Sequence, residues 1–368
     1  MASTNHLEHG QWDFKAGETM QSASTWQKVR LYSKFAAASL LCLYWVPEHY
    51  FFGSPRKMAS HLKIKVSQYA LKDADIEQLR LLVPARPLRS ELNGPLVQPY
   101  GSRFNDYNKM FPVDNASARW LYQVPDRTPQ DPVILYLHGG AYCLTTTPPQ
   151  VFWCLGFSKK LTSARVSVLA VDYTVSPQGR YPQQLEETIA VYQQLLTTCD
   201  RVITLGDSAG GHLAICLQLW CHENNFPKPL GCVLVSPWAE LWPDHKHGSY
   251  QENKYKDYLA LDDRYPAMFA DKSRESDPHV NPCRGSKAFW SGVFGPNTVN
   301  VWGEYEVLRD DCKRFSEVAG IINNLEQPKG VHDVLVVGTR NLTTDHLVKT
   351  VSQWLGVEST ALKVDPKL

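Results

Sequence analysis

The stretch Leu205-Gly206-Asp207-Ser208-Ala209-Gly210-Gly211-His212 decides the fold that we expect for this chain. It ends a short apolar run at residues 201–205, which predicts a buried strand, and it opens the run 211–220, which predicts a helix. A tight turn between a strand and a helix needs small neighbours, and it pushes the serine out toward a substrate and a base. The stretch therefore predicts that Ser208 is a nucleophile.

A second glycine-rich stretch strengthens this interpretation. Alone, the pattern Gly-x-Ser-x-Gly is weak evidence, since it arises by chance in roughly one chain in ten of this length. A glycine-rich turn with a capping serine would also explain it. His138-Gly139-Gly140 directly follows the apolar run 133–137, which predicts another buried strand. Glycines leave backbone N–H groups uncovered, so these groups can hold an oxyanion. The two stretches co-occur by chance in fewer than roughly one chain in a hundred.

The rest of the chain alternates between predicted strands and helices. Further strands are predicted at 118–124, 166–171, 231–235 and 299–302, and helices at 76–82, 181–199, 307–323 and 344–355. This alternation predicts an α/β fold with a doubly wound, mostly parallel sheet and a helical cap.

Four parts are expected along the chain. Residues 1–113 form an N-terminal segment with cap helices, of which about the first 27 residues lack regular structure. Residues 114–237 form the first part of the α/β core, 238–297 a cap or lid insert, and 298–368 the second part of the core. The insert is predicted because its Trp, Tyr, Pro and charged residues break the alternation.

The composition argues against several function classes. Lys plus Arg is 38 and Asp plus Glu is 37, so the balance gives no support to nucleic acid as a partner. The nine cysteines are scattered and show no zinc spacing, so we expect no metal site. We interpret them as mostly buried, reduced thiols, with one disulfide left open.

The apolar run 35–46 has two interpretations. At 12 residues it is shorter than the roughly 20 that cross a bilayer, so it predicts a cap helix or a segment that contacts a membrane. A cytoplasmic protein and one attached to the endoplasmic-reticulum membrane both stay open.

Five motifs together resemble the hormone-sensitive-lipase-like branch of the α/β-hydrolases, which are esterases with an HGG motif and a GDSAGG elbow. The motifs are 138–142 (HGGAY), 206–211 (GDSAGG), 236–238 (SPW), 303–310 (GEYEVLRD) and 330–333 (GVHD). Within that branch, the chain is similar to the membrane-associated steryl-acetate and arylacetamide deacetylases of fungi and animals.

The resemblance implies a role for each matching residue. Ser208 would be the nucleophile, His332 the base, and Glu306 the carboxylate that orients the base. The backbone N–H groups of Gly139, Gly140 and Ala209 would form the oxyanion hole. The chain order of serine, acid and histidine is that of this fold.

Other residues compete for two of these roles. The rivals of Glu306 are Glu304, Asp310 and Asp311, and the rival of His332 is His346. We interpret His138 as a brace for its loop and His212 as a packing residue.

The chain also departs from the branch, because residues 173–177 read YTVSP where Tyr-Arg-Leu-Ala-Pro is frequent. The aspartate that usually pairs with that arginine is Glu187 here. We therefore expect a buried ion pair of the branch to be absent or rewired.

The sequence thus predicts a serine carboxylesterase without cofactor, which hydrolyses small to medium acyl esters of lipophilic alcohols through an acyl-enzyme. Its partner would be a lipophilic small-molecule ester. Two alternatives stay open: an acyltransferase or lactonising or cyclising enzyme of secondary metabolism with the same catalytic residues, and a non-catalytic ligand-binding protein.

Overall fold

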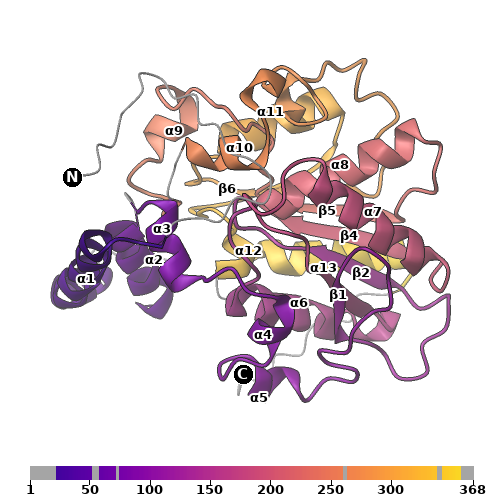
Figure 1. Cartoon of the computed structure of the whole chain (residues 1–368), viewed down its shortest axis with the longest axis horizontal. Helices are drawn as coiled ribbons and strands as arrows, with labels where there is room; N and C mark the ends of the chain where they lie inside the picture. Colours follow the sequence, from indigo (N-terminus) through magenta and orange to yellow (C-terminus); the bar gives the residue numbers. More distant parts are fainter. Residues whose placement is uncertain (1–21, 52–57, 72–73, 260–262, 338–341, 358–368) are drawn as a thin grey trace.

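The structure is a computed structural model that describes residues 22–51, 58–71, 74–259, 263–337 and 342–357. Its centre is a sheet with the strand order β1-β3-β2-β4-β5-β6-β7 (Figure 1). The strands are β1 (Ala118–Tyr122), β2 (Val133–Leu137), β3 (Ser167–Val171), β4 (Val202–Asp207), β5 (Gly231–Val235), β6 (Thr298–Gly303) and β7 (Asn323–Gln327). Strand β1 pairs antiparallel with β3, and the other pairings are parallel, as the sequence predicts.

Helices cover both faces of this sheet, because alternate residues of its buried strands point to opposite faces. On one face Leu135, Leu169 and Leu234 join a core with three helices. These are α7 (Gln183–Leu196), α8 (Ala209–Glu223) and α11 (Arg309–Ala319). On the other face Tyr136 and Leu205 pack with α6 (Pro148–Lys160) and α13 (Leu342–Leu355). Figure 1 shows α6 and α13 on the opposite side of the sheet from α7 and α8.

The segment between β5 and β6 contains no strand among its described residues. It folds into α9 (Gly248–Glu252), α10 (Arg264–Phe269) and the short turns η2 (Lys272–Arg274) and η3 (Pro282–Arg284). It therefore interrupts the alternation where the sequence predicts an insert, while the division of the chain into four parts stays a prediction.

The N-terminal helices lie to one side of the sheet (Figure 1). They are α1 (Thr25–Phe51), α2 (Met58–Leu71) and α3 (Ile76–Leu82), followed by the short α4 (Leu88–Leu92) and α5 (Gln98–Gly101). Helix α1 packs on α2 and α3 and buries Leu31, Ala38 and Trp45. None of the described helices has the length and hydrophobicity needed to cross a membrane. Residues 1–21 of the segment expected to lack structure lie outside the described residues, and α1 already begins at Thr25.

The end of the chain differs most from the expectation. The helix predicted at 307–323 is shorter, because it ends at Gly320, whose φ of 69° is left-handed. The following Asn-Asn-Leu-Glu-Gln forms edge strand β7, whose residues alternate between half-buried and exposed. Helix α6 and the short α12 (Val334–Val337) were likewise not predicted.

Candidate active site

Ser208 lies at a turn between β4 and α8 that only glycine neighbours permit. Its own backbone is strained, with φ 53° and ψ −117°. A Cβ atom on Gly206 would lie 2.1 Å from the carbonyl oxygen of Gly210, and one on Gly210 would lie 2.0 Å from that of Leu137. The two glycines of the motif are therefore required by close backbone approach, and the turn projects the Ser208 side chain from the end of the strand.

Three side chains meet at this turn in a hydrogen-bonded chain. His332 Nε2 lies 3.0 Å from Ser208 Oγ, and His332 Nδ1 lies 2.7 Å from Glu306 Oε1. The three residues come from the carboxyl ends of β4, β6 and β7, which lie at one edge of the sheet. Glu306 is fully buried, and Ser208 and His332 are only 7% and 3% exposed. The structure thus brings together the serine, acid and histidine that the sequence singled out.

The rival groups are engaged elsewhere. Glu304 accepts the Lys329 N–H at 2.7 Å, Asp310 pairs with Arg309 at 2.8 Å, Asp311 accepts the Tyr250 hydroxyl at 2.7 Å, and His346 is exposed on α13. Among these candidates, the hydrogen bonds of the structure select Glu306 and His332.

The two other histidines of the motifs have structural contacts, as interpreted from the sequence. His138 is buried and stacks on Tyr173, with ring centroids 4.1 Å apart. His212 lies between the Tyr142 hydroxyl at 2.6 Å and the Val280 carbonyl oxygen at 2.9 Å. Burial lowers the pKa of each imidazole to about 4, so both are neutral at physiological pH.

Glu187 accepts hydrogen bonds from neutral donors at the place where we expected an ion pair of the branch to be absent or rewired. Its carboxylate accepts the Thr174 backbone N–H at 2.6 Å and the Thr174 hydroxyl at 2.7 Å. Gln183 also donates to it, at 2.9 Å. Neutral donors thus take the place of the arginine.

Ser236 contacts the acid, and no role for its side chain was predicted from the sequence. Its hydroxyl donates to Glu306 Oε2 at 2.8 Å and accepts the Asp333 backbone N–H at 3.1 Å. The Gly303 N–H donates to the same Glu306 oxygen at 2.9 Å. One hydroxyl therefore links the loop that carries the acid to the loop that carries the histidine.

Asp257, from the insert, is a second residue that sequence reasoning missed. Its Oδ1 accepts the backbone N–H of His332 at 3.0 Å, and its Oδ2 accepts that of Val307 at 2.8 Å. Val307 directly follows Glu306, so a single buried carboxylate holds both loops. Because its partners are backbone amides, no residue pattern in the sequence could have revealed the contact.

Several carboxylates determine the electrostatics around the histidine. Burial lowers the pKa of His332, but the nearby Asp333, Glu306 and Asp257 outweigh burial and raise it above the ordinary value. Asp333 Oδ2 lies only 3.4 Å from His332 Nε2. Burial raises the pKa of Asp333 well above its usual range, and that of Asp257 to about 6. The site therefore favours the protonated imidazole.

The glycine loop after β2 lies against the turn that carries Ser208. A Cβ atom on Gly139 would lie 2.5 Å from Asp207 Oδ2. The Asp207 carboxylate accepts the Tyr136 hydroxyl at 2.6 Å and the Gln150 side-chain amide at 2.8 Å. Gly140 turns the chain sharply with φ 120°. Ala209 is the first residue of α8, and N–H groups in a first helical turn have no partner within the helix.

A small apolar cavity opens beside Ser208. Its volume is about 60 Å³. Most of its lining comes from the insert, and it includes Trp238, Leu241, Tyr250, Leu259 and Tyr265. Among the described residues, none of α1 lines this cavity.

The fold is that of an α/β-hydrolase. A hormone-sensitive lipase from a metagenome library has a similar structure, with a TM-score of 0.57 and 22% identity over 76% of this chain and 96% of that one. A family model described as steryl acetyl hydrolase matches residues 90–340, and the chain belongs to this family. It is a carboxylic ester hydrolase.

Two fungal relatives support this assignment. The protein mug81 of Schizosaccharomyces pombe, whose name places it among the steryl acetyl hydrolases, is 31% identical over 66% of this chain and 70% of its own length. Steryl acetyl hydrolase 1 of Saccharomyces cerevisiae is 29% identical over 57% of this chain. The match spans 54% of that yeast protein, about half its length. These findings confirm the resemblance to the esterases.

Proposed function

We propose that the chain hydrolyses esters through an acyl-enzyme on Ser208. The observation that carries this proposal is the buried chain Ser208–His332–Glu306, with contacts of 3.0 and 2.7 Å. Both distances are within hydrogen-bond reach, which a nucleophile and its base require. The short Nδ1 contact to Glu306 fixes the tautomer in which Nε2 faces the serine.

The reaction follows from these contacts. His332 Nε2 takes the Ser208 proton while Oγ attacks the ester carbonyl, and the imidazolium is stabilised by Glu306. The imidazolium then gives its proton to the leaving alcohol. Water attacks the acyl-serine in a second round, with His332 again as base, and the acid leaves as Ser208 is restored.

The oxyanion would be held by backbone N–H groups beside Ser208. The donors that we propose are the N–H groups of Gly139, Gly140 and Ala209, which lie in the glycine loop after β2 and at the start of α8. Removing one such donor typically costs a hundredfold or more in rate, roughly 3 kcal/mol.

We infer an acyl group at the small end of the expected range. A cavity of about 60 Å³ beside Ser208 holds only a few heavy atoms, which suits an acetyl group better than a long acyl chain. Its apolar lining suits the lipophilic alcohol part at the entrance. The names of the two fungal relatives favour acetyl esters as well.

We assign Asp257 as a positioning residue for this reaction. It touches neither substrate nor reacting atoms, but it fixes the backbones that carry the base and the acid. A shift of about 1 Å in either group can lower the rate a hundredfold.

We further propose that α1 rests on a membrane surface. The side of α1 that faces away from Leu31, Ala38 and Trp45 exposes large apolar side chains at helical spacing. These are Trp26, Val29, Tyr32, Leu40, Leu43 and Tyr44, each more than half exposed. The exposed Lys28 and Arg30 on the same helix suit anionic headgroups. The partner that we propose for this side of α1 is therefore the surface of a lipid bilayer, on which the helix lies without crossing it.

The decisive experiment is turnover of p-nitrophenyl acetate, butyrate and octanoate by the wild type and by Ser208→Ala. We expect acetate to be the best substrate and the variant to lose activity by roughly a thousandfold or more. Ser291→Ala, at an exposed serine, is the matched control and keeps full activity.

A fluorophosphonate probe separates the outcomes. Labelling of the wild type but not of Ser208→Ala supports the acyl-enzyme. Labelling without turnover of any of the three esters would replace hydrolysis by acyl transfer to another acceptor. Equal labelling of both proteins would overturn the role of Ser208.

A further inference from the structure

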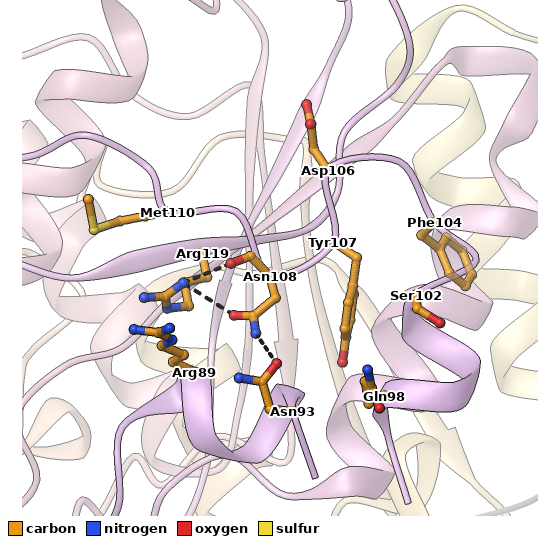
Figure 2. A pocket seen from close by; sticks show the side chains of 10 residues that line it. All are labelled: Arg89, Asn93, Gln98, Ser102, Phe104, Asp106, Tyr107, Asn108, Met110 and Arg119. Carbon is orange, nitrogen blue, oxygen red and sulfur yellow. Dashed lines mark hydrogen bonds between the residues drawn. The ribbon is translucent and has the colours of Figure 1, made fainter. Parts of the chain in front are cut away.

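A second hollow lies away from Ser208, between the short helices α4 and α5 and the edge strand β1 (Figure 2). Its volume is about 770 Å³. Arg89 comes from α4 and Arg119 from β1, and both line the hollow. Two guanidinium groups far apart in the sequence are thus brought to one place by the fold.

Neither guanidinium is neutralised there. Within the described residues, no carboxylate forms an ion pair with Arg89 or Arg119. The one acid of the lining, Asp106, is paired with Lys109 at 3.2 Å and lies apart from the two arginines in Figure 2. Burial lowers the pKa of Arg119, and the charge of Arg89 lowers it further, although Asp172 acts in the opposite direction. The two positive charges therefore repel each other across the hollow.

The hydrogen bonds between the lining residues use up acceptors and leave donors. Arg119 Nη1 donates to the Asn108 carbonyl oxygen at 2.7 Å and to Asn108 Oδ1 at 3.3 Å. Asn108 Nδ2 then donates to Asn93 Oδ1 at 2.8 Å (Figure 2). The amide oxygens are occupied, while the Asn93 amide nitrogen, the Arg89 guanidinium and the rest of the Arg119 guanidinium remain as donors. A site that offers donors and positive charge is built for an anion.

We propose that this hollow binds the phosphate group of a small phosphate or phosphomonoester. A planar guanidinium matches two oxygens at once. Two arginines and an amide are therefore matched better by the several oxygens of a phosphate than by the two oxygens of a carboxylate. Arg119 is held by Asn108 through Nη1 alone, and neither Arg89 nor Arg119 has a carboxylate that would compete with the phosphate within the described residues.

The walls beside the arginines suit an organic substituent on that phosphate. Phe104, Tyr107 and Met110 line the same hollow, and Met110 is 64% exposed. The Tyr107 ring is held in place by its hydroxyl, which donates to the Leu92 carbonyl oxygen at 2.8 Å. Apolar contact would therefore let a phosphomonoester bind more tightly than inorganic phosphate.

The test is calorimetric titration of the full chain with inorganic phosphate, phenyl phosphate and acetate in chloride buffer. We expect saturable binding of both phosphates, tighter for phenyl phosphate, and much weaker binding of acetate. Arg89→Gln and Arg119→Gln each weaken phosphate binding about tenfold or more, because each removes a charged hydrogen-bond partner. Arg103→Gln, at an exposed arginine outside the hollow, leaves the affinity unchanged.

Each result decides the proposal. Turnover of p-nitrophenyl acetate by Arg89→Gln at the wild-type rate shows that the variant is folded. No saturable binding to the wild type, or equal weakening by Arg103→Gln, overturns the site. Acetate binding as tight as phosphate binding overturns the assignment to phosphate. Binding of phenyl phosphate alone supports a phosphomonoester as the ligand rather than free phosphate.

Discussion

The single side chain of Asp257 holds the two loops that carry the acid and the base of the candidate active site. It is buried and accepts hydrogen bonds from three backbone N–H groups, those of Val307, His332 and Tyr258. A carboxylate with several amide donors needs no cation to be stable when buried. Because Asp257 lies between two loops, we expect the site to be sensitive to the loss of either carboxylate oxygen as an acceptor.

We predict that Asp257→Asn lowers kcat for p-nitrophenyl acetate about tenfold to a hundredfold, with little change in KM. The amide nitrogen would face a backbone donor, so one of the two loops loses its contact. Asp244→Asn, at an exposed aspartate outside the site, is the control. An equal fall in kcat for both variants, or an increase in KM alone, would contradict a positioning role.

The acid limb of the pH profile tests the electrostatics of His332. Its pKa is raised by the surrounding carboxylates, so the imidazole keeps its proton to a higher pH than usual. Only the neutral form can accept the Ser208 proton, so we expect kcat/KM to rise with pH through a limb above about 6.5. A wild-type limb at or below that value would contradict the raised pKa.

Asp333→Asn extends the same test. It removes the carboxylate that lies 3.4 Å from His332 Nε2, so the acid limb should move to lower pH. Asp244→Asn should leave it in place. An unmoved limb in Asp333→Asn would show that Asp333 carries no charge while the imidazole titrates.

At the scale of the element, α1 has two apolar sides, one packed against other helices and one exposed. One side is closed by α2 and α3, and its start is tied down by Gln27 Nε2, which donates to Asp75 Oδ2 at 2.9 Å. The other side carries exposed Leu and aromatic side chains. Such a continuous exposed apolar stripe is unusual on a surface that meets only water.

We predict that Leu40→Glu weakens binding to vesicles of phosphatidylcholine and phosphatidylserine about tenfold. The substitution removes an apolar group that is 71% exposed and adds a repelled charge. Ser39→Glu adds the same charge at the neighbouring position, outside the stripe, and should have a smaller effect. Cosedimentation measures both, and equal effects would mean that charge alone matters.

The elements that the sequence predicts well are those whose burial is continuous. Strands β2, β3, β4, β5 and β6 are buried along their whole length and have mostly apolar sequences, because both faces of the sheet are covered. Strand β7 was missed because an edge strand with Asn, Glu and Gln carries no such signal. The start of α1 was missed since its first turns are largely polar, although they pack on α3.

The residues of the candidate site also differ in whether the sequence predicts them. Ser208, Glu306 and His332 could be found from motifs, because their chemistry restricts the residue type. Ser236 and Asp257 act by holding backbone and carboxylate groups across loops distant in sequence. Such contacts depend on how the loops fold together, and a single sequence, taken by itself, does not reveal them.

At the scale of the whole molecule, the nine cysteines are all free, and all but Cys42 are buried. Burial raises thiol pKa values, for example that of Cys232 to about 11, which suppresses reaction. The structure therefore has no covalent cross-link, and its stability rests on the two cores that flank the sheet.

We predict that Ellman's reagent titrates nine thiols in denaturant but quickly modifies only Cys42 in the native protein. Addition of reductant should leave the midpoint of thermal unfolding unchanged. Cys42→Ser should abolish the rapid phase, and Cys232→Ser should not. A midpoint that falls with reductant would point to a disulfide.

The insert that forms the cavity wall also supplies Asp257, and this has a consequence for when the enzyme can act. If the insert swung away from the sheet, its carboxylate would leave both loops, and base and acid would lose their registration. An open form would then admit an ester but could not cleave it, and the insert would have to close before the reaction could begin.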